Sequence, residues 1–338
     1  MSEAARVALI GCGGIARRHV NDLLKRQDCR IVALCDTQPE AMAEKMALIR
    51  KVRPAEEPAM TGDYRTILER PDVDGVLILL PHSLHRPVAK EALEAGKHVL
   101  VEKPMTTSVA EAVDLISTAE RTGKKLGVAY QRSYMPEYLY AREAVKNGDL
   151  GEIRFMTVHM EQAWFKAVSR PERAKGWKAD PGQAGGGQLV DTGSHTLAAL
   201  LQVCQMDPEE VYASIDYCGL PVDVNTSMVV RFAQGPRAAI TIGGFGHSVT
   251  ESIRIVGDRA SYKIFFRTVA EQALEVDGKP VDARARFKLS NPDENFIDAI
   301  LGKGEIGADG LLGLRVAQLS EAAYRSAKEN RPARVERT

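Results

Sequence analysis

A glycine-rich turn stands directly between a short apolar strand and an amphipathic stretch near the start of the chain. Residues Arg6–Ile10 are predicted to form a buried strand, and the segment GCGGIA at residues 11–16 follows at once. Gly11 permits a tight turn, Gly13 lets the backbone approach a pyrophosphate, and Ala16 allows the next helix to pack close to the strand. The N–H groups and the positive dipole end of that helix also favour phosphate. Taken alone, the segment is also compatible with an ordinary tight turn.

A carboxylate at the end of the next apolar strand strengthens the nucleotide interpretation. Asp36 follows the predicted strand Ile31–Cys35 and lies twenty residues beyond Ala16. A carboxylate at this place can accept hydrogen bonds from the ribose hydroxyls of an adenosine. It would repel a 2′-phosphate, and neither Thr37 nor Gln38 supplies a positive charge to neutralise one. The pattern therefore favours NAD over NADP, and Asp36 could cap a helix at the same time.

Apolar runs alternate with amphipathic stretches through residues 1–131. The predicted strands are Arg6–Ile10, Ile31–Cys35, Gly75–Leu80, His98–Val101 and Leu126–Ala129. The predicted helices are Ile15–Arg26, Pro39–Lys51, Tyr64–Glu69, Pro87–Ala95 and Val109–Thr122. Strands that are apolar on both faces are typical of parallel sheets, and strand–helix repetition predicts right-handed crossovers. We therefore expect residues 1–131 to form an α/β domain of the Rossmann type, a doubly wound parallel sheet that binds NAD.

The pattern changes in residues 132–338, where longer runs alternate between apolar and polar residues. The predicted strands are Glu152–Gln162, Glu210–Cys218, Asn225–Ala233, Ala238–Phe245, Ser252–Val256 and Ser261–Phe266. The predicted helices are Met135–Asn147, Gln188–Gln202, Asn291–Leu301 and Asp309–Glu329. Alternation of this kind indicates a mostly antiparallel sheet with one face in water. We expect a second, α+β domain for the substrate, whose last helix could pack back on the first domain.

Unusual residues follow the carboxyl ends of all five predicted strands of the first domain. Open α/β sheets bind their ligands at this edge, so we expect the ligand site there. In chain order these residues are Gly11, Asp36, Pro81-His82, Glu102-Lys103-Pro104 and Tyr130-Gln131-Arg132.

Composition excludes several other classes of protein. Lys+Arg and Asp+Glu both number 45 among the 338 residues, so there is no basic surplus for nucleic acid. No apolar run approaches the roughly 20 residues that span a bilayer, and the N-terminus lacks a signal-peptide pattern. The 5 cysteines are scattered without a CxxC pair, which is typical of reduced thiols. We expect a cytoplasmic protein that binds neither nucleic acid nor membranes.

Further motifs resemble those of the glucose–fructose oxidoreductase/inositol dehydrogenase (Gfo/Idh/MocA) family. They are the Glu-Lys-Pro turn at residues 102–104 and GGGQLVDTGSH at residues 185–195, together with the opening turn and the loop from Pro81 to His85. None is specific alone, but their order is, and the resemblance covers almost the whole chain. It implies a Rossmann domain followed by an α/β domain with a large open sheet. It also implies homodimers or homotetramers that associate through that C-terminal sheet.

The resemblance implies a role for each matching residue. Lys103 would bond the reacting hydroxyl and the nicotinamide ribose, His195 would act as acid/base, and Asp191 would be its carboxylate companion. The segment Gly-Trp-Lys that ends at Lys178 resembles a Gly-Trp-Arg segment that reaches the cofactor in some members, and lysine cannot reproduce a bidentate guanidinium contact. The expected cofactor-binding residues are Gly11, Gly13, Gly14, Ile15, Ala16, Asp36, Pro81, His82, His85, Glu102, Lys103, Trp177 and Lys178.

These residue types suit the oxidation of a carbinol carbon by hydride transfer. The hydroxyl proton must leave, and an imidazole with an ordinary pKa near 6.5 is a good base for it. Asp191 and His195 are four residues apart, which would place them on one face of a helix. The Lys103 ammonium would favour alkoxide character in the transition state. We therefore expect an NAD-dependent dehydrogenase acting on a sugar, inositol or polyol-like substrate.

Other interpretations of the same residues stay open. Lys103 could be a surface lysine, and Asp191 with His195 an ordinary helical pair. The pair could also bind a metal with His159, Glu161 or His247, but no three-ligand spacing supports this and we expect no metal. The candidates for substrate contact are Tyr130, Arg132, His159, Glu161 and Trp164, the last also compatible with simple packing.

Two other functions fit the same fold. An NAD-assisted glycosidase or epimerase would use transient oxidation to acidify a neighbouring C–H bond, without accumulating NADH. A non-catalytic NAD-sensing regulator would be expected to lose the lysine, aspartate or histidine, yet Lys103, Asp191 and His195 are all present.

Overall fold

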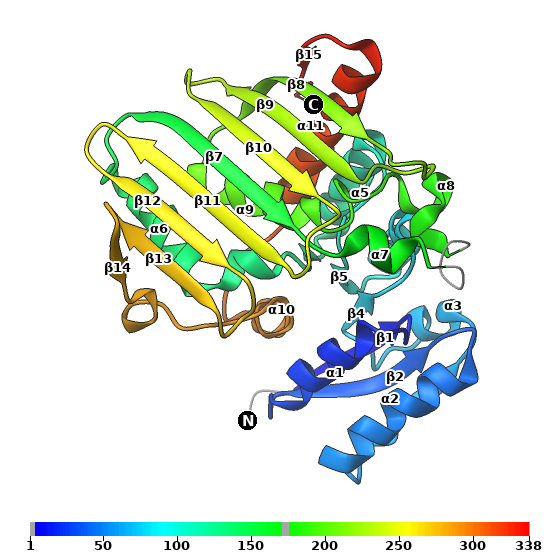
Figure 1. The fold of residues 1–338 in the computed structure, drawn as a ribbon. Helices are drawn as coiled ribbons and strands as arrows, with labels where there is room; N and C mark the ends of the chain where they lie inside the picture. The colour runs from blue at the N-terminus through cyan, green and yellow to red at the C-terminus, as the bar shows by residue number, and fades with distance from the viewer. Residues whose placement is uncertain (1–3, 171–175, 338) are drawn as a thin grey trace. The chain divides into compact units, whose positions relative to one another are not determined.

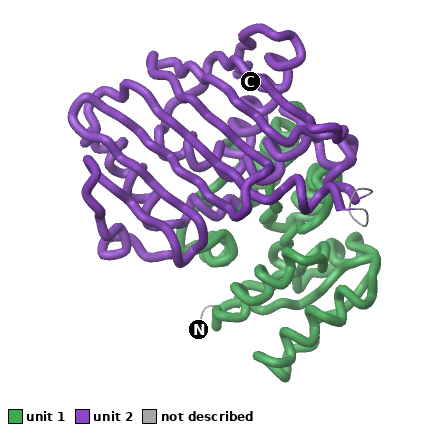
Figure 2. The backbone as a smooth tube through the Cα atoms, in the orientation of Figure 1, with its two compact units in different colours: residues 1–106, 110–129, 290–311 green, residues 107–109, 130–289, 312–338 purple. Residues whose placement is uncertain are grey.

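The computed structural model describes residues 4–170 and 176–337. The chain folds into two compact units, each of which collects separate stretches of sequence (Figure 2). Unit 1 contains residues 1–106, 110–129 and 290–311, and unit 2 contains residues 107–109, 130–289 and 312–338.

Unit 1 is built on a parallel six-stranded sheet with the order β3-β2-β1-β4-β5-β6. Its strands are β1 (Ala5–Ile10), β2 (Cys29–Cys35), β3 (Ala59–Thr61), β4 (Gly75–Ile78), β5 (His98–Val101) and β6 (Leu126–Val128). The strands from β1 to β3 are added on one side of β1, and the strands from β4 to β6 on the other side. The order of the strands therefore reverses between β1 and β4, which is the switch point of a doubly wound fold. The predicted Rossmann architecture is therefore confirmed. Sequence patterning missed only β3, which has three residues and no buried position.

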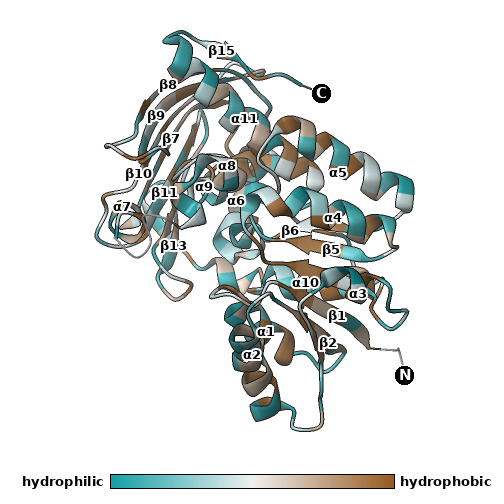
Figure 3. Ribbon diagram, turned by 90° about the vertical axis from the view of Figure 1, so that its right-hand side faces the viewer, coloured by the Kyte–Doolittle hydropathy of each residue, from teal (hydrophilic) through white to brown (hydrophobic). Residues whose placement is uncertain are grey.

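The helices of unit 1 cover this sheet with their apolar sides. They are α1 (Ala16–Leu24), α2 (Pro39–Val52), α3 (Tyr64–Leu68), α4 (His85–Glu94), α5 (Val109–Thr122) and α10 (Pro292–Ile300), with a 3-10 turn η1 (His82–Leu84) before α4. The strands are mostly hydrophobic, whereas the helices carry hydrophilic residues on part of their surface (Figure 3). Val20 of α1 and Leu34 of β2 are fully buried in one core, which accounts for the close packing of α1 on the sheet.

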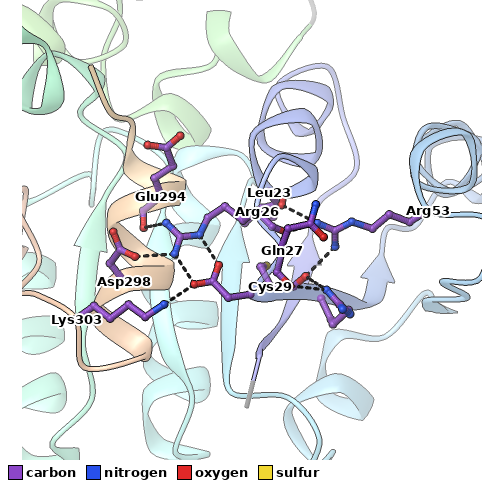
Figure 4. Close-up of polar contacts among 10 residues, drawn as sticks. Leu23, Arg26, Gln27, Cys29, Arg53, Glu294, Asp298 and Lys303 are labelled. Atoms are coloured by element: carbon purple, nitrogen blue, oxygen red, sulfur yellow. Dashed lines mark hydrogen bonds and ion pairs between the residues drawn. The ribbon is translucent and has the colours of Figure 1, made fainter. Parts of the chain in front are cut away.

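The late segment 290–311 belongs to unit 1 because both apolar and ionic contacts hold it there. Phe296 and Ile297 of α10 are fully buried in the same core as the first strands. Arg26 donates to Asp28 and to Asp298 of α10 at 2.9 and 2.6 Å (Figure 4). Arg26, which follows α1, thereby joins the end of that helix to a helix about 270 residues further along the chain.

Unit 2 is built on a nine-stranded sheet with the order β14-β13-β12-β11-β7-β10-β9-β8-β15. Its strands are β7 (Ile153–Glu161), β8 (Pro208–Asp216), β9 (Asn225–Phe232), β10 (Arg237–Gly243), β11 (Thr250–Gly257), β12 (Ser261–Phe266), β13 (Gln272–Val276), β14 (Lys279–Val281) and β15 (Ala333–Arg334). β7 and β10 pair in parallel and the other neighbours are antiparallel, as expected for a mostly antiparallel sheet. Patterning missed β13, β14 and β15, which are short.

One face of the unit 2 sheet is covered by helices and the other is open (Figure 1). The helices are α6 (Pro136–Asn147), α9 (Gly193–Cys204) and α11 (Gly310–Glu329), of which α11 belongs to unit 2 from Leu312 onward. On β7, Met156, Val158 and Met160 are buried on the covered face, and the residues between them point the other way. Two short helices, α7 (Trp164–Val168) and α8 (Pro181–Ala184), follow β7.

Candidate functional site

The glycine-rich turn after β1 has room above it that the protein does not fill. Gly11 has a φ of 98°, and a Cβ there would lie 2.3 Å from the carbonyl oxygen of Leu79, so only glycine fits. A Cβ at Gly13 or Gly14 would meet nothing within 4 Å. Packing within the chain therefore does not require glycine at either position, whereas close approach of a phosphate group would require it at Gly13.

The start of α1 fits the same ligand. Ile15, 42% exposed, is the N-cap residue, and Ala16 is fully buried at the first helical position. The N-cap makes no side-chain hydrogen bond, which leaves the first N–H groups of α1 to the turn and to a phosphate.

Asp36 is held in place at the end of β2 by two backbone groups. Its Oδ2 accepts a hydrogen bond from the Cys12 N–H at 2.7 Å, and its Oδ1 accepts one from the Gln38 N–H at 2.9 Å. Each carboxylate oxygen can accept a second bond, so the group retains capacity for ribose hydroxyls. Together with the open turn, these residues fit an adenosine diphosphate half of NAD.

The segment that follows β4 contacts the turn that carries Lys103. His85 is fully buried, with Nδ1 2.7 Å from the Pro104 carbonyl oxygen and Nε2 2.9 Å from the Leu80 carbonyl oxygen. Burial lowers the pKa of His85, and these two carbonyl contacts oppose the shift. Pro81 caps η1, and the buried His82 ring lies 5.6 Å from the ring of His85. His85 therefore supports the Lys103–Pro104 turn from inside unit 1.

Glu102, directly after β5, belongs to a buried charged cluster that sequence patterning did not reveal. Its Oε1 lies 3.2 Å from His19 Nε2, and the other ring nitrogen of His19 lies 2.7 Å from Asp293 Oδ1. Its Oε2 accepts a hydrogen bond from the Lys103 N–H at 3.0 Å. The backbone around Lys103 is thus held by Glu102 on one side and by His85, through Pro104, on the other.

Burial and charge act in opposite directions on this cluster. Burial by itself lowers the pKa of His19, but the Asp293 and Glu102 carboxylates raise it to about 10. Burial by itself raises the pKa of Glu102, but its hydrogen bond and charge interaction with His19, together with Lys103, lower it to about 2. His19 is therefore charged and Glu102 is ionised at neutral pH.

In unit 2, Asp191 is buried and bound by two donors from the segment after β7. Its Oδ2 accepts from the Trp164 Nε1–H at 2.9 Å and from Lys178 Nζ at 2.6 Å. Trp164 is only 4% exposed, so its ring does not offer the open surface that stacking on a sugar requires. The Lys178 ammonium lies 5.4 Å from the centre of the Trp177 ring. Trp164 and Lys178 are thus placed to orient the Asp191 carboxylate.

The helix that carries His195 begins later than predicted. α9 starts at Gly193, and residues 188–192 form turns, so the expectation that Asp191 and His195 share one helical face is wrong. His195 lies in the first turn of α9, half-buried, with its ring edge-on to Tyr130 at 6.0 Å between centroids. Tyr130 is 1% exposed, and the structure brings this substrate candidate together with His195.

Asp223 explains why the helix begins late. Its buried carboxylate accepts hydrogen bonds from the backbone N–H groups of Gly187 and Leu189 at 2.6 and 2.7 Å, and from the Tyr324 hydroxyl of α11. A Cβ at Gly187 would lie 2.0 Å from the Asp223 carbonyl oxygen, so the chain passes too close for any other residue. The backbone N–H groups of Gly187 and Leu189 are therefore bound to Asp223, and the regular helix α9 begins only after the turn that they start. Only the run of three glycines pointed to this close approach.

The remaining substrate candidates do not join the Asp191 group. The Arg132 side chain is buried against Glu251, Nε to Oε1 3.3 Å, with its guanidinium 4.2 Å from the centre of the Phe266 ring. His159 and Glu161 lie on the open face of the sheet, where His159 Nδ1 is 2.9 Å from Thr241 Oγ1. Their contact with substrate stays a prediction.

Gln162, the next residue, does reach the turn before α9. Its Nε2 donates to Gln188 Oε1 at 3.1 Å and to Thr192 Oγ1 at 2.6 Å. The end of β7 therefore supports the segment that carries Asp191.

Within residues 4–170 and 176–337, no three or more His, Cys, Asp or Glu side chains gather closely enough to bind a metal ion. Among the helices of the same residues, none combines the length and the apolar character needed to cross a bilayer.

Comparison with known proteins identifies both halves of the chain. Residues 5–130 match the family model described as "Oxidoreductase family, NAD-binding Rossmann fold", and residues 138–263 match the "GFO/IDH/MocA C-terminal domain". The chain is 31% identical over 264 residues to a dTDP-3,4-didehydro-2,6-dideoxy-alpha-D-glucose 3-reductase of Streptomyces violaceoruber, covering 77% of this chain and 72% of the relative.

Two further comparisons extend this likeness. A 1-carboxy-3-chloro-3,4-dihydroxycyclohexa-1,5-diene dehydrogenase of Comamonas testosteroni is 28% identical over 250 residues, which span 73% of this chain but only 60% of the relative. The crystal structure of aldose-aldose oxidoreductase from Caulobacter crescentus, complexed with glycerol, superposes with a TM-score of 0.85 at 25% identity, over 98% of this chain and 100% of the other.

Proposed function

Because the chain belongs to the Gfo/Idh/MocA family of NAD-binding oxidoreductases, we propose that it is an NAD-dependent dehydrogenase. Its substrate would be a sugar, an inositol or a polyol-like molecule, oxidised at a secondary alcohol or at the anomeric carbon. The sugar-converting relatives support this substrate class. The observation that carries the proposal is the fixed presentation of Lys103, whose backbone is held by Glu102 and, through Pro104, by His85.

The cofactor would be held by the residues described above. The turn at residues 11–16 would take the pyrophosphate, and Asp36 would accept hydrogen bonds from the adenosine ribose and disfavour a 2′-phosphate. Trp177 and Lys178 are proposed contacts from unit 2. NAD, when bound, supplies the acceptor for the hydride that leaves the carbinol carbon.

The acid–base work is assigned to three side chains. Lys103 would donate a hydrogen bond to the hydroxyl oxygen and stabilise the negative charge that develops as its proton leaves. His195 would take that proton, and the fixed charge of Asp191 would favour the imidazolium that forms. The carbon thus loses a hydride and the oxygen loses a proton, which leaves a carbonyl group.

A panel assay tests this proposal. Purified protein is incubated with polyols, inositols and aldoses, with NAD and NADP side by side, and absorbance of the reduced cofactor is followed. The reverse reaction, NADH with keto sugars, is included because one relative is a reductase. Steady turnover supports the dehydrogenase if the variants Lys103→Ala and His195→Asn abolish it. Product without accumulated NADH identifies the glycosidase or epimerase instead, and binding without turnover identifies the regulator.

We also propose a homo-oligomer that associates through the open face of the unit 2 sheet. Tyr212 pairs with Val229, Val229 with Ala239, and Ala239 with Thr157, so one row across four strands presents its side chains on this face. Tyr212 and Val229 are 45% and 46% exposed, which is unusual for large apolar residues that lie side by side. Light scattering of the wild type and of Val229→Glu tests this, since the charge should convert the oligomer to monomers.

The state of the cysteines fits the expected cytoplasmic location. All five are free, and four of them are buried. Burial raises the pKa of Cys12 to about 12, so this thiol beside the nucleotide turn stays protonated and unreactive. Such thiols suit a reducing compartment.

A further inference from the structure

His19 joins three segments of unit 1 that are far apart in the sequence. It lies in α1, the helix that follows the nucleotide turn; Glu102 directly follows β5, and Asp293 lies in the first turn of α10. The His19 and Asp293 side chains are 4% and 3% exposed, and that of Glu102 is 14% exposed. A histidine in this position is thus almost fully enclosed between two carboxylates.

The geometry and the charges together favour a doubly protonated ring. An ionised carboxylate oxygen can only accept a hydrogen bond, and each ring nitrogen of His19 faces one, at 2.7 and 3.2 Å. Between two ionised carboxylates both nitrogens carry a hydrogen, which makes the side chain an imidazolium. Two buried carboxylates without this cation would be strongly unfavourable.

The position of Asp293 depends on the late segment of the chain. Phe296 and Ile297 anchor α10 in the core, and Asp298 is bound by Arg26 (Figure 4). The same helix therefore delivers the carboxylate that keeps His19 charged. This gives residues 290–311 a link to Glu102, and Glu102 is adjacent to Lys103.

Glu102 also faces a competing cation. Lys103 follows it directly and contributes to the low pKa of Glu102. A carboxylate beside an ammonium group favours a short charge-assisted bond with it. Because His19 already binds Oε1 and supplies a positive charge, the attraction of Glu102 for the Lys103 ammonium is weaker, while Oε2 still orients the Lys103 N–H.

We propose that His19 is a positioning residue for Lys103: held by Asp293, it fixes Glu102 and keeps that carboxylate from drawing the lysine ammonium away from the substrate. The inference rests on the catalytic role proposed for Lys103. It assigns the effect of His19 to the acid–base step and not to cofactor binding.

Two substitutions separate the two hydrogen bonds of His19. His19→Gln can place an amide N–H where Nε2 was and retain the bond to Glu102. His19→Asn can place one where Nδ1 was and retain only the bond to Asp293. We expect kcat to fall at least tenfold in His19→Asn and several-fold less in His19→Gln, with the Kd for NADH, measured by fluorescence, changed less than threefold in both.

A second readout does not depend on turnover. The full chain is treated with trace acetic anhydride, and acetylation of Lys103 is compared by mass spectrometry with that of the exposed Lys279 on β14. We expect Lys103 to react several-fold more slowly in His19→Asn, because Glu102 then binds its ammonium. Adding Glu102→Gln to His19→Asn removes the competing charge and should restore the reactivity.

A matched control tests the specificity of the effect. His98 lies at the start of β5, the strand that leads to Glu102, and its Nδ1 accepts the Lys125 N–H. His98→Asn should leave the reactivity of Lys103 unchanged. If His19→Asn folds poorly, Asp293→Asn supplies the test, since it removes the charge from α10 but keeps an acceptor for the ring.

The outcomes distinguish this proposal from the proposed function. Unchanged Lys103 reactivity in His19→Asn or in Asp293→Asn overturns the positioning role, and so does a failure of Glu102→Gln to restore it. If the wild type turns over no substrate in the panel, the dehydrogenase proposal fails, and the labelling experiment still decides whether His19 controls Lys103.

Discussion

The two units each fix a candidate catalytic segment with a buried carboxylate, but they use different partners to do so. In unit 1, Glu102 binds a charged imidazole, and a second carboxylate keeps that imidazole protonated. In unit 2, Asp223 binds two backbone N–H groups and a tyrosine hydroxyl. The first arrangement depends on protonation, whereas the donors of the second keep their hydrogens throughout the working pH range. The comparison indicates that pH should loosen the Lys103 turn long before it loosens the segment before His195.

The largest effect is expected for Asp223→Ala. The substitution leaves two buried backbone N–H groups and the Tyr324 hydroxyl without their acceptor, and each costs about 1–3 kcal/mol. We expect the free energy of unfolding to fall by about 3–6 kcal/mol in urea titrations. Asp223→Asn keeps an acceptor oxygen, so its free energy of unfolding should fall clearly less. Equal losses would mean that Asp223 acts through its shape and not as an acceptor.

The pH dependence of stability should come from unit 1. The pKa of His19 is raised to about 10, so its contribution is complete below its unfolded pKa near 6.5 and is lost as pH rises through 10. The pKa of Glu102 is lowered to about 2, so its contribution is present above about 4.5 and is lost as pH falls through 2. The cluster therefore stabilises most between about pH 4.5 and 6.5.

Denaturant titrations at several pH values measure this contribution. Between pH 6.5 and 10 the wild type should lose stability, by about the 3–5 kcal/mol that breaking a buried ion pair costs. His19→Gln has no imidazolium to lose and should show a much flatter profile. If Asp223→Asn flattens the pH profile of stability as much as His19→Gln does, the expected difference between the two units is wrong.

A smaller effect is expected where Asp191 is bound. Trp164→Phe removes one of the donors described for Asp191, and a hydrogen bond to a charged group contributes about 1.5–3 kcal/mol. We expect stability to fall by that amount and kcat to fall about tenfold, because the carboxylate is held less firmly. Lys178→Met, which removes the more exposed donor, should affect stability less. Stability and kcat are measured on both variants, and a larger stability loss in Lys178→Met would reverse the order of the two donors.

The smallest effect is expected for Tyr324→Phe. It removes one of the three donors to Asp223 and leaves the two backbone bonds in place. Burial and the nearby Asp223 raise the pKa of Tyr324 well above its usual value, so the hydroxyl stays a donor at all working pH values. We expect a loss of about 1 kcal/mol that is independent of pH. A loss that grows with pH would show that the hydroxyl titrates.

Local sequence patterns predicted the part of the site whose residues directly follow the predicted strands. The turn at residues 11–16 and Asp36 follow directly after their strands. The bond from the Gln38 N–H to Asp36 is local, and the bond from the Cys12 N–H joins the ends of the neighbouring parallel strands β1 and β2. The Glu-Lys-Pro turn was found in the same way. His19, Asp293 and Asp223 were not, because their partners lie 83, 274 and 36 residues away.

One wrong helix boundary and one unforeseen partner show the same limit. The late start of α9 depends on Asp223, which no pattern within residues 185–195 contains. Arg132 follows a strand, as ligand-binding residues of this fold do, but Glu251 lies 119 residues further on and binds its guanidinium in the interior.

The sequence by itself determined the strand–turn–helix order and the nucleotide turn with its acidic partner, and its resemblance to the family implied the candidates Lys103, Asp191 and His195. The order of elements follows from residue spacing, because backbone geometry repeats every two residues in a strand and every 3.6 in a helix. Only the tertiary structure decided which buried charges meet, and with it the protonation of His19 and the course of the chain before His195. A buried charge requires a partner, and that partner can come from any segment that the fold brings within about 3 Å.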